Sequence, residues 1–358
     1  MTGTAAPDEP FEPIGGWEIN RPVDWQEVGH IRSSSLHINP NQGDAMETPV
    51  IEVSNLSKRY GDRAAVQGIS FAVNKGEIFG IIGPNGAGKT TTVEILEGLR
   101  QRDGGKVRVL GLDPSTDGDE LRKRVGVQLQ ESELPGKIKV WEALDLYASF
   151  YEQPVDWEGL LNSLGLDDRR NMRFEKLSGG AKQRLSIALA LVGNPEIAIL
   201  DELTTGLDPH ARRETWDLIE GIRERGVTVV LVTHFMEEAE RLCDRIAVFD
   251  SGRLVAIDTP AGLVSRVNVQ QRLRFRTTST LDDRLLTALP GVVNVSRSGA
   301  QVVVTGTGNL LNVVISALAR EEIVALDLRA DQVTLDDAFV ALTGGDHEPV
   351  GAHQGGLR

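Results

Sequence analysis

One short run of residues has the types and the spacing needed to bind phosphate. It lies between an apolar stretch at 78–82 and a helical stretch, and it reads Gly83, Pro84, Asn85, Gly86, Ala87, Gly88, Lys89 and Thr90. Glycines let consecutive backbone N–H groups point at one anion, the helix N-terminus adds its dipole, and Lys89 supplies a point charge. The Thr90 hydroxyl is suited to Mg²⁺. The run predicts a site for a nucleoside triphosphate with magnesium; the alternative is a plain glycine-rich turn.

Two acids and a histidine follow two further apolar stretches. Asp201 and Glu202 come directly after 196–200, and His234 comes after 228–233. Because α/β sheets place ligand chemistry at the carboxyl ends of their strands, we expect all three side chains beside the phosphate loop. In such an enzyme one acid holds Mg²⁺ and a second orients or deprotonates the attacking water. Acid pairs are common at the ends of strands, so this pair alone is a weak sign of a catalytic site. The phosphate loop in the same chain makes it a strong one.

A second loop suited to anions runs from Leu177 to Gly180 and precedes a helical stretch at 181–191. It combines glycine amides, a serine hydroxyl and a helix N-terminus. Together with 83–90, and with Leu200 to Pro209 followed by Thr233 and His234, it resembles the nucleotide-binding subunit of ATP-binding cassette (ABC) transporters. The resemblance covers about residues 50–265, and its motifs occur in the order and spacing of that family.

The resemblance implies roles for the residues at the phosphate end of the site. Residues Gly83 to Thr91 would hold the phosphates of ATP, and Thr90 would also hold Mg²⁺. Asp201 would support the metal, Glu202 would be the catalytic base, and His234 would contact the γ-phosphate.

Further roles follow from the same resemblance. Tyr60 would stack on adenine, unless it is only a turn aromatic. Gln130 aligns best with the glutamine loop, which contacts Mg²⁺ and the attacking water and leads towards the membrane partner; Gln128 is the alternative. Asp208 would lie in the loop that crosses to a partner subunit.

The resemblance also implies a homodimer of the ATPase domain. Ser178, Gly179 and Gly180 would contact the ATP held by the opposite subunit, so that two copies enclose two nucleotides and a lone chain hydrolyses poorly. Two positions depart from the usual pattern of the family. Ala181 stands where glutamine is common, and Leu203 replaces the proline that commonly follows the catalytic acid. Neither change removes a proposed catalytic group, but the first puts contact with the opposite nucleotide in question.

The elements that must position these residues suggest an α/β fold. Strands are expected at 51–53, 69–73, 78–82, 107–110, 124–127, 197–200, 228–232 and 245–249, and continuous apolar strands indicate a sheet covered on both faces. We therefore expect a phosphate-loop ABC ATPase domain at 49–265 with an inserted helical subdomain at about 131–190. A strand-helix-strand-strand-helix-strand order predicts a small ferredoxin-like α+β domain at 266–345. Residues 1–48, which contain Trp17 and Trp25, and 346–358 are expected to be disordered.

Composition limits the class of protein. Among 358 residues 40% are hydrophobic, the formal charge is −14 and the pI is near 5.0. An acidic chain lacks the basic surface that nucleic-acid binding normally needs, so no nucleic-acid partner is expected. No apolar stretch approaches the roughly 18 residues that span a bilayer, and the N-terminus does not look like a secretory signal. The single cysteine, Cys243, excludes an internal disulfide and suits a packed thiol.

These observations lead to an expected function. A cassette without membrane helices would drive a separate polytopic permease from the cytoplasmic face of the cell membrane. The stretch 130–134 and the closing segment 335–339 resemble exporter ATPases of the daunorubicin-resistance type, so we expect export of a drug-like, lipid or polysaccharide substrate. The main alternative is a soluble ABC ATPase acting on ribosomes or DNA, and a second is a small-molecule kinase. Members of the first class usually carry two cassettes or long coiled coils, which this chain lacks.

Overall fold

The computed structural model describes residues 49–128, 134–267, 271–277, 281–299, 301–331 and 333–344. The chain divides into two units, 1–45 and 46–358, and all described residues lie in the second. The expected disordered ends, Trp17, Trp25 and Gln130 lie outside the described residues. No helix in the described ranges is long and apolar enough to cross a membrane.

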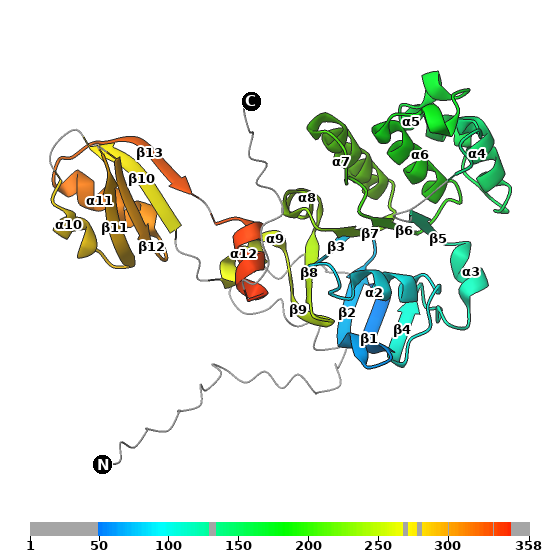
Figure 1. The fold of residues 1–358 in the computed structure, drawn as a ribbon, viewed down its shortest axis with the longest axis horizontal. Coiled ribbons are helices and arrows are strands. Elements are labelled where there is room, and N and C mark those ends of the chain that lie inside the picture. Colours follow the sequence, from blue (N-terminus) through cyan, green and yellow to red (C-terminus); the bar gives the residue numbers. More distant parts are fainter. Residues whose placement is uncertain are drawn as a thin grey trace, which may run out of the picture. The chain divides into compact units, whose positions relative to one another are not determined.

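A six-stranded sheet forms the centre of the region expected at 49–265 (Figure 1). Its strand order is β5 (Val125–Gln128), β6 (Ile197–Asp201), β7 (Thr228–Thr233), β3 (Ile78–Ile82), β8 (Arg245–Asp250) and β9 (Arg253–Asp258). The first five strands are parallel, and β9 pairs antiparallel with β8. Every residue of β3, β6 and β7 is buried, as expected for strands covered on both faces. The carboxyl ends of β3, β7 and β6 consequently lie side by side.

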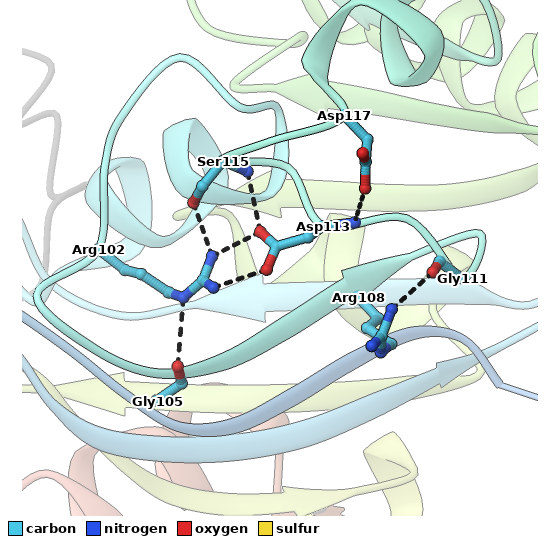
Figure 2. A network of polar contacts seen from close by, with 7 residues as sticks. All are labelled: Arg102, Gly105, Arg108, Gly111, Asp113, Ser115 and Asp117. Atoms are coloured by element: carbon cyan, nitrogen blue, oxygen red, sulfur yellow. Dashed lines mark hydrogen bonds and ion pairs between the residues drawn. The ribbon is translucent and has the colours of Figure 1, made fainter.

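A second, antiparallel sheet has the order β2 (Arg63–Asn74), β1 (Pro49–Tyr60) and β4 (Gly104–Val109). It shares one apolar core with β3, β7 and β8 of the central sheet, in which the rings of Phe71 and Phe79 stack with centroids 5.5 Å apart. The turn after β4 is fixed by a polar network around Arg102 (Figure 2). Arg102 donates to both carboxylate oxygens of Asp113, at 2.8 and 2.7 Å, and this pairing lowers the pKa of Asp113 to about 2.

Helices cover the central sheet and form the inserted subdomain. They are α2 (Lys89–Leu96), α3 (Gly118–Arg122), α4 (Val140–Ala148), α5 (Trp157–Ser163), α6 (Gly179–Leu191), α7 (Pro209–Glu224), α8 (Met236–Leu242) and α9 (Pro260–Arg266), with short 3₁₀ turns at Asp167–Arg169 and Phe174–Lys176. Helices α4, α5 and α6 pack on one another through a core that continues into β6 and β7. Helices are therefore present where the sequence predicts the inserted subdomain.

The region after 270 contains β10 (Gln271–Thr277), α10 (Asp283–Thr287), β11 (Val292–Ser298), β12 (Gln301–Gly306), α11 (Leu310–Arg320) and β13 (Ala325–Asp331). Its antiparallel sheet has the order β11-β12-β10-β13, which is the ferredoxin-like arrangement predicted from the sequence. Helices α10 and α11 cover one face of this sheet over a separate apolar core that includes Leu273, Phe275 and Val304.

The closing helix α12 (Leu335–Leu342) packs against the larger domain, at 49–265. It contacts α9 and α8, and Leu335, Phe339 and Leu342 join the core of that domain. Thr334 and Asp337 form a reciprocal capping box that starts the helix. The sequence-based prediction places this helix in the small domain at 266–345, whereas its apolar face is buried on α8 and α9.

Candidate active site

The phosphate loop joins β3 to α2 and wraps around the ammonium group of Lys89. The side chain is 5% exposed, and its Nζ donates to the carbonyls of Gly83 at 2.7 Å and Pro84 at 3.1 Å. Gly88 has a φ of +96°, and a Cβ there would lie 2.4 Å from the carbonyl oxygen of Ala65, so only glycine fits. The loop thus holds a buried cation at the start of a helix, the arrangement that binds phosphate.

Two carboxylates interact with this lysine. Burial lowers the pKa of Lys89, while the charges of Glu202 and Asp201 act in the opposite direction. Asp201 is the last residue of β6, and its backbone N–H donates to Oε1 of Gln128 at 3.2 Å. Burial, and next the charge of Glu202, raise the pKa of Asp201 to about 6. The structure thus brings together Lys89, Asp201 and Glu202, three of the residues singled out from the sequence.

Glu202 and His234 face each other across neighbouring strand ends. The Glu202 Oε1 lies 3.3 Å from Nδ1 of His234, the residue that follows β7. The Glu202 backbone is left-handed, with a φ of +48°, and its N–H donates to the Val232 carbonyl at 2.9 Å. A non-glycine residue in this region is uncommon and clusters at functional sites. The turn after β6 therefore fixes Glu202 in a position where His234 orients its carboxylate.

Glu97, which sequence analysis missed, lies behind this cluster at the C-terminus of α2. It is 5% exposed, and its Oε2 has no hydrogen-bond partner among the described residues. Burial, followed by the charges of Asp201 and Glu94, raises its pKa to about 8. A sequence signal for the burial of Glu97 was available. Glu97 follows the apolar Val93 by four residues, and residues at that spacing share a helix face.

The second loop expected to bind anions, at 177–180, lines a separate hollow of about 270 Å³. Ser178 caps α6, with its Oγ accepting from the Ala181 N–H at 3.3 Å, and Gly179 and Gly180 form the first turn. Asp208 caps α7, where Oδ1 accepts from the N–H groups of His210 and Ala211. The hollow is lined by Ser178, Gly179, Gly180, Arg184, Gly206, Leu207, Asp208, His210, Ala211 and Glu214. Two segments predicted to meet a partner subunit thus share one surface.

Residues missed on this surface are Arg184 and Glu214. Their side chains pair at 3.1 Å, and His210 lies 3.6 Å from the same carboxylate. The four-residue spacing from His210 to Glu214 on α7 was the available sequence signal.

Other predicted positions occupy the expected elements. Tyr60 ends β1 and is half exposed, with the Arg100 guanidinium 5.2 Å from the centre of its ring. The following turn reaches the phosphate loop, because Arg63 donates to the Gly86 carbonyl at 3.3 Å. Thr90 is exposed on the first turn of α2, and Thr91 is half-buried there.

The two positions that depart from the family pattern are both fully buried. Ala181 packs inside the helical core and Leu203 packs below the turn after Glu202. Both side chains contribute to packing and neither lies on the exposed rim of the hollow.

Comparison with known proteins places the chain in a family. The ABC transporter family model matches residues 66–205. The linearmycin resistance ATP-binding protein LnrL of Bacillus subtilis is 33% identical over 313 residues, which cover 82% of this chain and 98% of the relative. The Nod factor export ATP-binding protein I of Rhizobium etli is 41% identical over 229 residues, covering 63% of this chain and 72% of the relative.

Solved structures agree with this placement. CbiO1 of Clostridium perfringens, part of an ABC transporter complex, is 28% identical with a TM-score of 0.56, covering 62% of this chain and 95% of that chain. A dimeric ATP-binding cassette bound to ADP and phosphate after hydrolysis is also 28% identical, with a TM-score of 0.53, covering 58% and 98%. With the phosphate loop, the strand-end acids and the histidine assembled as described, the chain belongs to the ATP-binding proteins of the ABC transporter family and is an ATPase.

Proposed function

We propose that this ATPase drives the export of a substrate through a separate polytopic membrane permease. The observation that carries the proposal is the similarity to a linearmycin resistance protein over 98% of that protein's length, because a match of 313 residues extends beyond the ATPase domain into the small domain. A second group of relatives is named for Nod factor export. A drug-like, lipid or polysaccharide substrate is consistent with both names.

Magnesium is proposed as the companion of ATP. Burial raises the pKa of Asp201 first, and the like charges of Glu202 and Glu94 raise it further; a divalent cation would relieve this repulsion. Thr90 and Asp201 would hold the ion, and Gln130 is proposed as a further contact. Mg²⁺ keeps several ligands from phosphates and water, so two or three protein oxygens are sufficient.

In the proposed catalytic site, Lys89 and the backbone amides of 83–91 bind the phosphates while Tyr60 stacks on adenine. Glu202 accepts a proton from the attacking water, and His234, 3.3 Å away, keeps the carboxylate aimed and contacts the γ-phosphate. The bound ion would supply charge stabilisation at the phosphates. The left-handed backbone at Glu202 supports this role, because it holds the base in one orientation before ATP arrives.

A homodimer around two ATP molecules is proposed for the active state. Ser178, Gly179 and Gly180 present the N-terminus of α6 to the hollow that Asp208 also lines, and such a surface suits the phosphates of a nucleotide held by a second copy. The similar cassette bound to ADP and phosphate is itself dimeric.

The permease would dock beside the helical subdomain and hold the ATPase at the cytoplasmic face of the membrane. At the end of α4 the side chains of Leu146 and Phe150 are exposed, the latter by 68%. Single exposed apolar residues are ordinary, but neighbouring ones mark interaction surfaces, so Leu146 and Phe150 support a docking site here.

The test is affinity capture of a tagged Glu202→Gln chain from detergent-solubilised native membranes with ATP and Mg²⁺, followed by mass spectrometry. The exposed Glu240→Gln variant is the matched control, since it makes the same change away from the site. A stoichiometric multi-span membrane protein, enriched with Glu202→Gln, is the expected result. Recovery of ribosomes or nucleic acid, with no membrane protein, would contradict the export proposal and favour the soluble alternative.

A further inference from the structure

The small domain has an open sheet face that is rich in arginine. Strand β10 alternates arginine with apolar residues, so Leu273 and Phe275 point into the core while Arg272, Arg274 and Arg276 share the opposite face. Helices α10 and α11 cover only the apolar face, as their place in that core shows. Strand β13 pairs with β10 and adds Arg329 directly opposite Arg274.

Two of these arginines lie directly opposite each other on paired strands. Like charges directly opposite each other on neighbouring strands are destabilising, and Arg274 and Arg329 form such a pair. Arg274 is partly neutralised by Asp331, whose Oδ2 accepts from its Nη2 at 2.5 Å. Arg276 pairs with Asp327. Arg329 forms no hydrogen bond with another residue that the structure describes, although its charge contributes to lowering the pKa of Asp327.

The same face is hollowed by about 510 Å³. Its lining consists of Arg274, Arg276, Ser298, Gln301, Asp327 and Arg329, which supply three guanidinium groups, one carboxylate, a hydroxyl and an amide. The surplus of positive charge is local, because the whole chain carries a formal charge of −14. A bulge in β13, between the residues opposite Arg274 and Arg276, places Asp327 at a φ of +52°. Bulges are frequent next to binding sites, where they re-aim a side chain.

We propose that this hollow binds a ligand bearing a phosphate ester. Planar guanidinium groups bind phosphate oxygens through paired hydrogen bonds, and a phosphate between Arg274 and Arg329 would replace their repulsion by attraction to a shared anion. Ser298 and Gln301 can donate to ester or hydroxyl oxygens beside it. The hollow has no aromatic side chain among its described lining residues, so it lacks the platform on which unpaired RNA bases stack. A phosphorylated metabolite and a phospholipid headgroup carry the same group.

The experiment compares two double variants of the full chain saturated with MgADP, which occupies the phosphate loop. Arg274→Gln with Arg329→Gln removes the opposed pair, and Arg284→Gln with Arg320→Gln removes two exposed arginines from the helices of the same domain. One arm measures inorganic pyrophosphate binding by calorimetry. The other measures co-sedimentation with phosphatidylglycerol vesicles, using phosphatidylcholine vesicles as the reference. Thermal unfolding verifies folding, and Arg329→Gln alone serves if the double variant unfolds.

We expect at least about a tenfold loss of binding in the Arg274→Gln, Arg329→Gln chain, because two charge-assisted contacts disappear, and no loss in the control pair. A difference in the pyrophosphate arm supports recognition of a soluble phosphate group, and a difference confined to the vesicle arm supports recognition of a lipid headgroup. Equal binding by both double variants in both arms would overturn the proposal. ATP turnover should be the same in both, since neither pair belongs to the catalytic site.

Discussion

At the residue scale, the acid after β6 owes its position to backbone geometry as much as to its side chain. Glu202 has left-handed backbone angles and is tied to the Val232 carbonyl, and its carboxylate meets His234. Holding these angles in a residue other than glycine costs on the order of 1 kcal/mol or more. The hydrogen-bonded pairing of β6 with β7, which ends next to Glu202, offsets this cost.

Replacing Glu202 by Gln is expected to slow ATP turnover at least about a hundredfold while ATP binding is retained. The amide keeps the size of the side chain and its contact with His234 but cannot accept the proton of the attacking water. Steady-state ATPase rates and nucleotide affinity measure the two effects separately. The Glu240→Gln control should match the unsubstituted chain. Near-normal turnover in the Glu202→Gln variant would remove this residue from the role of base.

Glu97 gives a pH-dependent prediction. Its pKa is about 8 in the folded chain against 4.5 for an ordinary glutamate, so the folded state holds a proton that the unfolded state releases. Its contribution to stability is therefore complete below about pH 4.5 and is lost as the pH rises towards 8. Glu97→Gln should remove this loss and gain on the order of 4 kcal/mol relative to the parent chain between pH 5 and 8.

The measurement is urea unfolding at both pH values without nucleotide or metal. Glu240→Gln provides the comparison, because its side chain is exposed in the fold. Parallel pH profiles for the parent chain and Glu97→Gln would show that Glu97 is ionised in the folded state.

The chemistry-bearing residues could be predicted from the sequence where they belong to local motifs. The phosphate loop, Asp201, Glu202 and His234 each follow an apolar strand, so the chain itself places them at one sheet edge. Glu97 and the Arg184 and Glu214 pair could not be predicted in the same way. Four-residue spacing indicates which helix face each of these residues shares, but their partners depend on which helix faces meet in three dimensions.

At the scale of elements, the predicted strands are present but their grouping was not foreseen. The sequence indicated a sheet covered on both faces but not which strands pair, and the structure separates β1, β2 and β4 into an antiparallel sheet of their own. Strand β1 runs from Pro49 to Tyr60, well beyond the predicted 51–53, because several register irregularities let polar residues join the ladder. Apolar pattern identifies the buried centre of a strand, while pairing between distant segments decides its length and its partners.

The docking of α12 gives a prediction about stability. Leu335 is 1% exposed in the core of the ATPase domain, so Leu335→Ala should lower the free energy of unfolding by about 2–5 kcal/mol. Val340 lies on the same helix but is 44% exposed, and Val340→Ala should change the free energy of unfolding by no more than about 0.5 kcal/mol. Denaturant unfolding followed by circular dichroism measures both. Equal effects of the two substitutions would mean that the helix contributes little to the domain.

At the scale of the whole molecule, the hollow beside α6 makes dimerisation testable without disturbing the fold. Aspartate and asparagine both cap helices as well as serine does, so Ser178→Asp and Ser178→Asn should keep α6 intact. Only Ser178→Asp adds a negative charge where the phosphates of a partner's ATP would lie. In the Glu202→Gln background, we expect Ser178→Asp to weaken the ATP-dependent dimer at least about tenfold.

Sedimentation velocity with ATP and Mg²⁺ distinguishes the two variants. Ser178→Asn is the control and should dimerise like its parent. If Ser178→Asp dimerises equally well, the surface beside α6 does not face a nucleotide in the assembled protein. An arrangement of this kind depends on a second chain, so the sequence could suggest it only through the resemblance to a family.

The chain carries one cysteine, and its sulfur fills a tight space under β3. Cys243 is buried, and a Cβ added to Gly80 would lie only 2.7 Å from its Sγ. Burial raises the pKa of the thiol above its ordinary value, so almost no reactive thiolate exists in the closed fold. Cys243 is therefore a natural probe of conformational opening. The rate at which an alkylating reagent modifies its thiol reports how often the junction of α8 and β8 separates from β3, and no engineered label is needed.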